Sequence, residues 1–247
     1  MNWEISTTEG TAAAFHDRDP ESDTGHQVWT HRLQGPALVL GSTQPDELVR
    51  RERAEADGIE VCRRRSGGGL VFINPETDCW VDVIVPHSSP LWDDDVARAF
   101  HWLGELWATV ISELIADAAA NNHAPSPVVH RASAATAVGR VWCFADLGHG
   151  EVSLQGSKVL GLSQRRTRTW LRLQGLLLGA WPGDRLLPYV DLDYLVENHP
   201  ERFGNAELLR PGHLAAGFPA EVAAPSPADT TARFTSAIQQ QFSNQDR

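Results

Sequence analysis

The chain contains 247 residues, with 21 Lys and Arg against 32 Asp and Glu, which gives a formal net charge of −11. Hydrophobic residues make up 42% of it, a composition typical of a globular protein that can bury a large core. The acidic balance argues against a nucleic-acid partner, because phosphate neutralisation needs a basic surface. No stretch approaches the ~20 apolar residues of a membrane helix, so no membrane partner is expected. The opening MNWEISTTEG is no secretory signal and three cysteines are too few for a disulfide framework, so we expect a reduced, cytoplasmic setting.

The expected strands and helices do not alternate regularly along the chain. This irregular order predicts an α+β fold in which mixed or antiparallel sheets pack with helices. Residues 1–25 have few large apolar side chains and are expected to be loosely ordered. The main catalytic domain is expected over residues 26–220. Residues 221–247 are expected to supply a linker and a C-terminal helix that packs on the same domain.

Periodicity and turn signals predict the individual elements. Strands are expected at residues 28–33, 37–41, 59–62, 70–73, 79–85, 151–155, 158–163 and 171–178. Helices are expected at residues 45–57, 93–119, 191–198 and 226–242. The helix over 93–119 has the clearest pattern, since its apolar residues recur at steps of three and four. The long irregular stretch 121–150 is typical of a functional or a disordered loop.

The segment Arg63-Arg64-Arg65-Ser66-Gly67-Gly68-Gly69 lies between two of the expected strands. Three successive glycines suit a place where the backbone approaches a ligand closely or adopts a positive φ. Adjacent guanidinium groups suit a carboxylate or a phosphate, because the planar fork binds oxyanions in pairs. On an extended strand Arg63 and Arg65 would point to one side and Arg64 to the other. A flexible basic surface turn is the alternative.

Lys158 is the one lysine among the 21 basic residues. It begins the second strand of the predicted hairpin, after Gly156-Ser157. At the start of a strand its ammonium can stabilise negative charge that develops on a carbonyl or phosphoryl oxygen. An exposed hairpin lysine is the alternative. A chain that uses arginine everywhere else favours the functional interpretation, because a guanidinium fork cannot replace a compact point charge.

Together these two motifs resemble those of the catalytic domain shared by lipoate–protein ligases, octanoyltransferases and biotin–protein ligases. RRRSGGGLVF is similar to the lipoate-ligase loop, and GSKVLGLSQRRTR is similar to the lysine strand of that family. The resemblance covers about residues 26–180. It implies that Lys158 contacts the activated acyl group. It also implies a set of residues that line the acyl and adenylate pocket: Arg63, Arg64, Arg65, Ser66, Gly67, Gly68, Gly69, Gly161, Ser163 and Arg165.

Cys143-Phe144 precedes the lysine hairpin. In some octanoyltransferases of this family a Cys-Phe pair at this position supplies the nucleophile that holds the acyl thioester. A cysteine suits that step, because a thiolate is both a good nucleophile and a good leaving group. Trp142-Cys143-Phe144 can equally be a short apolar strand with a structural cysteine. Cys79 and Cys62 are expected in the core.

The resemblance leaves the reaction open among three alternatives. A lipoate–protein ligase would use ATP and Mg²⁺ to form an acyl-adenylate from lipoate or octanoate. An octanoyltransferase would need no cofactor and would move octanoyl from acyl-carrier protein through a Cys143 thioester. A non-catalytic relative would only bind acyl chains or a carrier. HRASAATAVGRVWCF stands where lipoate ligases carry their adenylate-contacting Ser-Gly-Arg-Asn-Asp, which weakens the case for ATP.

For either enzyme the resemblance implies that the acceptor is a lysine of a lipoyl carrier domain. Such domains belong to 2-oxoacid dehydrogenase complexes or to the glycine cleavage H protein, and they are typically acidic. An acidic protein needs a local basic patch to meet an acidic partner. We therefore expect Arg166, Arg168 and Arg172 to steer the carrier, with a solvated strand face as the alternative. The histidines show no metal-ligand spacing, so no metal site is expected.

Overall fold

The computed structural model describes residues 1–21, 24–118, 125–220 and 222–243. A seven-stranded sheet has the order β1 (Trp3–Gly10), β2 (His26–Leu33), β6 (Cys79–Pro86), β10 (Trp170–Leu177), β9 (Ser157–Arg166), β8 (Val152–Leu154), β7 (Val128–Val129). Within it β1 and β2 are parallel, and every other neighbouring pair is antiparallel. A smaller sheet has the order β4 (Glu60–Arg63), β3 (Ala37–Leu40), β5 (Val71–Ile73). The predicted α+β fold with mixed sheets is confirmed.

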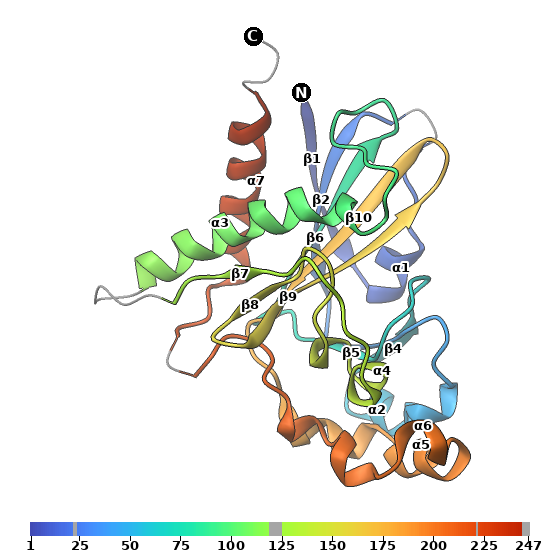
Figure 1. Ribbon diagram of the computed structural model, residues 1–247. Coiled ribbons are helices and arrows are strands. Elements are labelled where there is room, and N and C mark those ends of the chain that lie inside the picture. Colours follow the sequence, from blue (N-terminus) through green and yellow to red (C-terminus); the bar gives the residue numbers. More distant parts are fainter. Residues whose placement is uncertain (22–23, 119–124, 221, 244–247) are drawn as a thin grey trace.

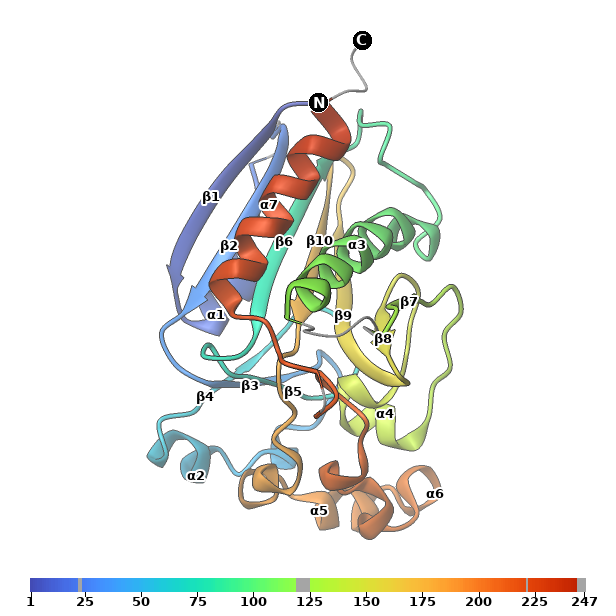
Figure 2. The ribbon, with the colours of Figure 1, turned by 90° about the vertical axis from the view of Figure 1, so that its left-hand side faces the viewer.

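Helices cover both sheets. The α-helices are α1 (Ala12–Asp17), α2 (Arg51–Ala56), α3 (His101–Ala118), α4 (Ala137–Val141), α5 (Leu192–Asn198), α6 (Pro200–Phe203) and α7 (Pro227–Ser243). Short 3-10 turns are η1 (Asp46–Leu48), η2 (Arg98–Phe100), η3 (Cys143–Ala145), η4 (Gly183–Tyr189), η5 (Ala206–Leu209) and η6 (Pro211–His213). Helices α3 and α7 lie together on one face of the large sheet, and α2, α5 and α6 lie beyond the small sheet (Figures 1 and 2).

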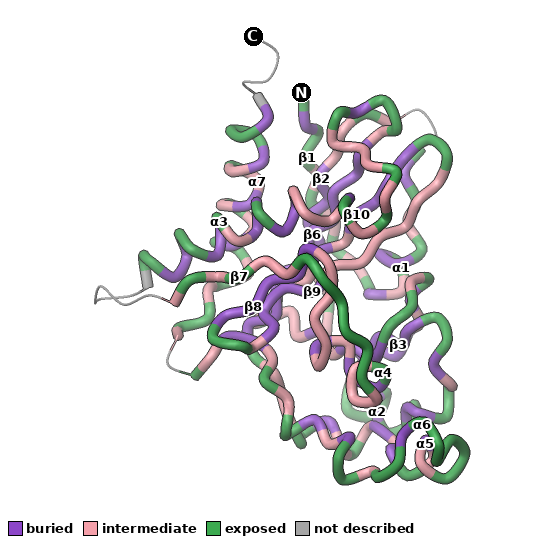
Figure 3. Tube along the Cα trace, viewed as in Figure 1, coloured by how far each residue is buried: buried purple, intermediate pink, exposed green. Residues whose placement is uncertain are grey.

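The main core lies between the large sheet and the α3–α7 layer (Figure 3). Leu103, Trp107 and Val110 of α3 are fully buried there, as the periodicity of this segment predicts. The α-helix begins eight residues later than expected, because the first helical turn is the 3-10 turn η2, at whose start Asp95 accepts hydrogen bonds from the backbone N–H groups of Ala97 and Arg98. In the described ranges no helix is long and apolar enough to cross a membrane.

The expectation of a loosely ordered segment at residues 1–25 was wrong for most of its length. Strand β1 pairs along its whole length with β2, and helix α1 follows it. Glu60 of the small sheet accepts hydrogen bonds from the backbone amides of Ala12 and Ala13, at 2.7 and 2.9 Å. The segment is ordered by partners far along the chain, which its own polar composition cannot reveal.

Two further expectations needed correction. The hairpin turn consists of Gln155 and Gly156, with φ of 49° and 85°, so it lies one residue before the expected Gly156-Ser157 turn. The single helix expected over residues 45–57 divides into η1 and α2. The C-terminal helix was predicted correctly, and Phe234 and Ile238 bury its inner face in the main core.

A buried ion pair fixes helix α1 on the sheet. Asp82 of β6 lies opposite Gln174 of β10, two residues from Arg172, and the side chains of Asp82 and Arg172 are both almost completely buried. Burial alone would raise the pKa of Asp82, but Arg172 and His31 hold it well below its ordinary value. Arg172 also donates to the backbone carbonyls of Phe15 and Arg18, which ties α1 to the centre of the sheet.

We predict that Arg172→Met lowers the free energy of unfolding by about 3–5 kcal/mol, because it leaves the buried Asp82 carboxylate without its guanidinium partner and with His31 alone beside it. Urea denaturation measures the change. Adding Asp82→Asn should recover part of the loss, since a neutral amide needs no counter-charge. A loss below about 1 kcal/mol in Arg172→Met would contradict this account of the pair.

Candidate active site

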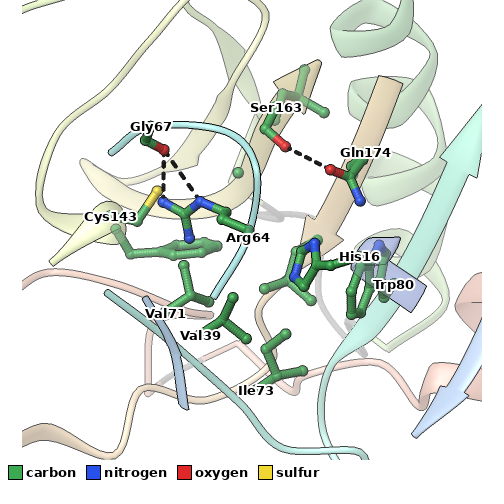
Figure 4. Close-up of a pocket in the computed structure, with 15 residues that line it drawn as sticks. His16, Val39, Arg64, Gly67, Val71, Ile73, Trp80, Cys143, Ser163 and Gln174 are labelled. Atoms are coloured by element: carbon green, nitrogen blue, oxygen red, sulfur yellow. Dashed lines mark hydrogen bonds between the residues drawn. The ribbon is translucent and has the colours of Figure 1, made fainter. Parts of the chain in front are cut away.

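A pocket lies between the two sheets, at the place where β9 and β10 pass over the small sheet (Figure 4). Its floor is apolar and consists of Val39, Val71 and Ile73 from the small sheet, with Trp80 and Leu176 from the large one. At one end it reaches Cys143, Arg64 and Gly67. At the other end it reaches His16, Ser163 and Gln174. The arrangement suits a narrow apolar chain with its reactive group at the Cys143 end.

The glycine loop, residues 66–69, is joined to the chain around Cys143 by backbone hydrogen bonds. Leu70 N–H donates to the carbonyl of Val141 at 2.6 Å, and Cys143 N–H donates to the carbonyl of Leu70 at 3.0 Å. A Cβ on Gly69 would lie 2.6 Å from the carbonyl oxygen of Gly139, so only glycine permits this approach. Gly68 has φ of 97°, a conformation that also favours glycine.

The side chain of Arg64 lies inside the glycine loop and binds its backbone. The side chain is buried and donates to the carbonyls of Gly67 and Gly69, at 3.0 and 2.7 Å from Nη2. No carboxylate among the described residues forms an ion pair with it. A buried guanidinium that donates to carbonyl oxygens and has no ion-pair partner can stabilise negative charge that develops on a bound carbonyl or carboxylate oxygen.

The Cys143 thiol and the Arg64 guanidinium converge on the inner face of Gly68. A Cβ placed there would lie 2.9 Å from Arg64 Nη2 and 3.8 Å from Cys143 Sγ. Cys143 is half-buried and lines the pocket in η3, in place of the short strand that was the alternative. Cys62 and Cys79 are buried as predicted, and burial raises the pKa of each thiol to about 12.

Lys158 is buried and its ammonium has three partners. These are the carboxylate of Glu151 at 2.6 Å and the carbonyls of Cys143 and Asp146, both at 2.9 Å. The ammonium therefore holds the cysteine turn, residues 143–146, through two of its backbone carbonyls. Phe144 lines the pocket, and its ring centroid lies 5.1 Å from Lys158 Nζ. The exposed hairpin lysine that was the alternative is excluded.

The far end of the pocket is polar but uncharged. Burial lowers the pKa of His16 to about 3, so its imidazole is neutral near pH 7. The ring lies 4.6 Å from that of Trp80. Ser163 Oγ donates to the amide oxygen of Gln174 at 3.3 Å. These groups limit the length of an apolar chain that the pocket can accept.

The structure separates the other loop residues that were expected to bind the ligand. Arg63 donates to the carbonyls of Gly41 and Gln44, and Arg65 pairs with Asp17 and Asp19. Neither lines the pocket, whereas Arg64 does, and β4 ends at Arg63, so the three arginines do not follow one extended strand.

Two small residues of the expected set have different surroundings. Ser66 Oγ is buried without a hydrogen-bond partner among the described residues. Gly161 lies in the pocket wall, where a Cβ would come within 3.0 Å of the Phe144 ring.

The expected basic patch after the lysine strand is smaller than predicted. Arg172 was expected to steer a carrier, but it is buried in its ion pair with Asp82 and cannot contact a partner. Arg165 pairs with Asp19 at 2.8 Å and does not line the pocket. Arg166 lies over the ring of Trp92, and Arg168 is exposed in the turn between β9 and β10.

Sequence reasoning missed Glu151, His16 and Gln174. Glu151 was only placed in a strand, although a buried lone lysine calls for an acidic partner nearby. His16 lay in the segment expected to be loosely ordered, and nothing local linked it to the pocket. Among the described residues, no group of three or more His, Cys, Asp or Glu side chains is placed to hold a metal ion.

We predict that iodoacetamide at pH 8 alkylates Cys143 much faster than Cys62 or Cys79 in the native protein. Only Cys143 is partly exposed, and the raised pKa of the other two thiols leaves few thiolates. Peptide mapping after short exposure measures the three rates, with denatured protein as the control in which they should converge. Equal rates in the native protein would contradict the placement of the thiols.

Comparisons with known proteins agree with this architecture. The sequence matches the model of the family described as "Lipoyl protein ligase A/B catalytic domain" over residues 11–186, so the match includes helix α1. A search of curated proteins finds no match.

Several solved structures share the fold. A Thermoplasma acidophilum protein described as a lipoate protein ligase, with bound lipoic acid, has a TM-score of 0.63 and 14% identity, over 98% of this chain and 85% of that one. The bi-partite lipoate protein ligase of the same organism, described with its E2 lipoyl domain, has a TM-score of 0.62 and 16% identity, over 98% of this chain and 83% of that one. A lipoate-protein ligase A bound with ATP has a TM-score of 0.58 and 15% identity, over 98% of this chain and 86% of that one.

At these identities the structures establish the fold, while the family model covers most of the chain and the whole pocket. The chain belongs to the lipoyl protein ligase A/B catalytic domain family.

Proposed function

We propose that this protein transfers a medium-chain acyl group, octanoyl or lipoyl, to a lysine of a lipoyl carrier domain through a thioester on Cys143. The observation that carries the proposal is the position of the thiol. It lies at the mouth of an apolar pocket, and it shares the inner face of Gly68 with a buried arginine that has no ion-pair partner among the described residues. This placement supports a nucleophile over a structural cysteine.

The reaction consists of two acyl transfers. The Cys143 thiolate attacks the carbonyl carbon of an acyl thioester, a new carbon–sulfur bond forms, and the donor leaves as a thiolate that takes up a proton. The carrier lysine then attacks as a neutral amine, an amide bond forms, and the Cys143 sulfur leaves and regains a proton from the amine. Arg64 lies where charge develops on the carbonyl oxygen in both steps, and it can stabilise that charge without rearrangement.

The pocket supports a medium-length acyl group. Val39, Ile73 and Leu176 would contact the methylene chain, and His16 and Gln174 would end the space available to it. A buried methylene contributes about 0.8 kcal/mol, so a chain of several carbons supplies most of the binding energy.

The proposed acceptor is a lipoyl carrier domain of a 2-oxoacid dehydrogenase complex or the glycine cleavage H protein. The T. acidophilum ligase described with its E2 lipoyl domain supports this partner class. Arg166 and Arg168 remain the proposed steering contacts, because Arg166 forms no ion pair in the described part of the chain and Arg168 is exposed beside it.

An ATP-dependent ligase is the second candidate. Arg64 and the glycine loop could receive the carboxylate of free lipoate or octanoate, and ATP with Mg²⁺ would then activate it. The fold shared with an ATP-bound lipoate-protein ligase A is compatible with this reaction. The half-exposed thiol beside Arg64 has no role in it, which is why the transferase is preferred.

The central test replaces Cys143 with serine. With octanoyl-acyl-carrier protein and a lipoyl domain, wild type should form the octanoylated domain and Cys143→Ser should lose nearly all of this activity, because a serine hydroxyl is a far poorer nucleophile than a thiolate and an alkoxide is a far poorer leaving group. Mass spectrometry of the domain measures the product. Cys62→Ser is the matched control and should stay active, since Cys62 lies in the small sheet.

Each other outcome has a distinct meaning. Full activity of Cys143→Ser with ATP and octanoate would establish the ligase instead. If wild type modifies the lipoyl domain neither with octanoyl-acyl-carrier protein nor with ATP and octanoate, the result would support a non-catalytic relative.

Lys158→Arg should slow formation of the Cys143 thioester about 10²-fold, because a guanidinium cannot occupy the buried site between Glu151 and the carbonyls of the cysteine turn. Stopped reactions followed by intact-protein mass spectrometry measure this rate. We expect the affinity for free octanoate to stay within a few-fold, since Lys158 does not line the pocket. Loss of octanoate binding with an unchanged rate at saturation would contradict a positioning role.

A further inference from the structure

A second cavity opens on the other side of the glycine loop. It has a volume of about 300 Å³ and lies between α4, α6 and the turn after β3. Its wall is basic, with Arg140 of α4, Arg202 of α6 and His199 between α5 and α6. We call this cavity the basic groove. No Asp or Glu side chain is among the residues that line it.

The charges of the basic groove are not used within the described parts of the chain. Arg140 and Arg202 are exposed and form no ion pair there, although the protein carries a net charge of −11 and six of the eleven exposed arginines in the described ranges are paired. Two carboxylates near the groove already have partners. Asp46 pairs with Arg63, and Asp146 accepts hydrogen bonds from Thr136 at the start of α4.

The groove is connected to the thiol through Gly68. This residue lines the groove, while the position of its missing side chain faces Arg64 and Cys143. Hydrogen bonds fix the end of α4 against the turn after β3: the side-chain amide of Gln44 donates to the carbonyls of Arg140 and Val141, at 2.9 and 3.1 Å. The apolar pocket and the basic groove therefore meet at the two sides of one residue, next to the nucleophile.

We propose that the basic groove binds the phosphate group of the activated acyl donor while the acyl chain enters the apolar pocket. Because the inference rests on the proposed function, the donor it favours is an acyl thioester of phosphopantetheine, whose phosphate is anionic both as the free monoester and as the diester that links it to a carrier. Arg140 and Arg202 supply charge-assisted hydrogen bonds to phosphate oxygens, and His199 supplies a further ring nitrogen. The phosphates of ATP have the same chemistry, and the experiment separates the two sources.

The test compares octanoyl-phosphopantetheine with octanoyl-pantetheine, which differ only in the phosphate. Wild type should form the Cys143 thioester at least about tenfold more efficiently with the phosphorylated donor, as the loss of one charge-assisted hydrogen bond predicts. Arg140→Glu/Arg202→Glu should lose this preference and react with octanoyl-pantetheine as wild type does. Arg32→Glu/Arg185→Glu is the control, because it reverses two exposed charges outside the groove.

Equal efficiency of wild type with both donors, or a preference that survives in Arg140→Glu/Arg202→Glu, would overturn the inference. Loss of the preference in the Arg32/Arg185 control as well would also overturn it, since net charge alone would then explain the effect.

Failure of the proposed function gives a different pattern. If neither donor forms a thioester, the transferase proposal fails and the groove is tested with ATP, octanoate and a lipoyl domain. A KM for ATP raised at least about tenfold in Arg140→Glu/Arg202→Glu supports the groove as a phosphate site for a nucleotide, and an unchanged KM overturns it.

Discussion

The contact on which the site depends is the pairing of Leu70 with the backbone on either side of Trp142. Two hydrogen bonds of 2.6 and 3.0 Å join chain segments that lie more than 70 residues apart, and they place the cysteine turn against the glycine loop. Gly69 permits the approach because any side chain there would meet the backbone of Gly139. Lys158 holds the turn from the opposite side through the carbonyls of Cys143 and Asp146. The thiol is thus positioned by backbone groups before any substrate arrives, which is the condition for efficient nucleophilic catalysis.

The electrostatics of the centre follow from two buried arginines with different surroundings. Arg172 has a carboxylate partner in Asp82 and serves the fold, because it anchors helix α1 and with it the His16 end of the pocket. Within the described ranges Arg64 has only carbonyl partners, so its charge beside the thiol is not neutralised by a carboxylate there. In an apolar surrounding, such a charge can stabilise the negative charge that the proposed acyl transfer would develop, while the neutral His16 end suits the uncharged part of an acyl chain.

The sequence allowed the fold class, the glycine loop, the lysine strand and the thiol to be identified, because each has a local signal of glycines, periodicity or motif spacing. It could not show that Lys158 turns toward the cysteine turn, since that direction depends on Glu151, which hydrogen bonds to Gly148 and Leu162 as well. Arg172 was predicted to contact a carrier, whereas the register of β10 against β6 buries it beside Asp82. Strand β1 was missed because its polar sequence is stabilised by β2, and the basic groove joins three segments that no pattern connects.

The most direct test of the account is a crystal structure of the protein after reaction with an octanoyl thioester. We expect continuous density from Cys143 Sγ into the apolar pocket beside Val39 and Ile73, with the acyl oxygen toward Arg64 and with Lys158 still bound to Glu151. An octanoyl group on another residue or outside this pocket, or a Lys158 ammonium that has moved onto the acyl oxygen, would contradict it.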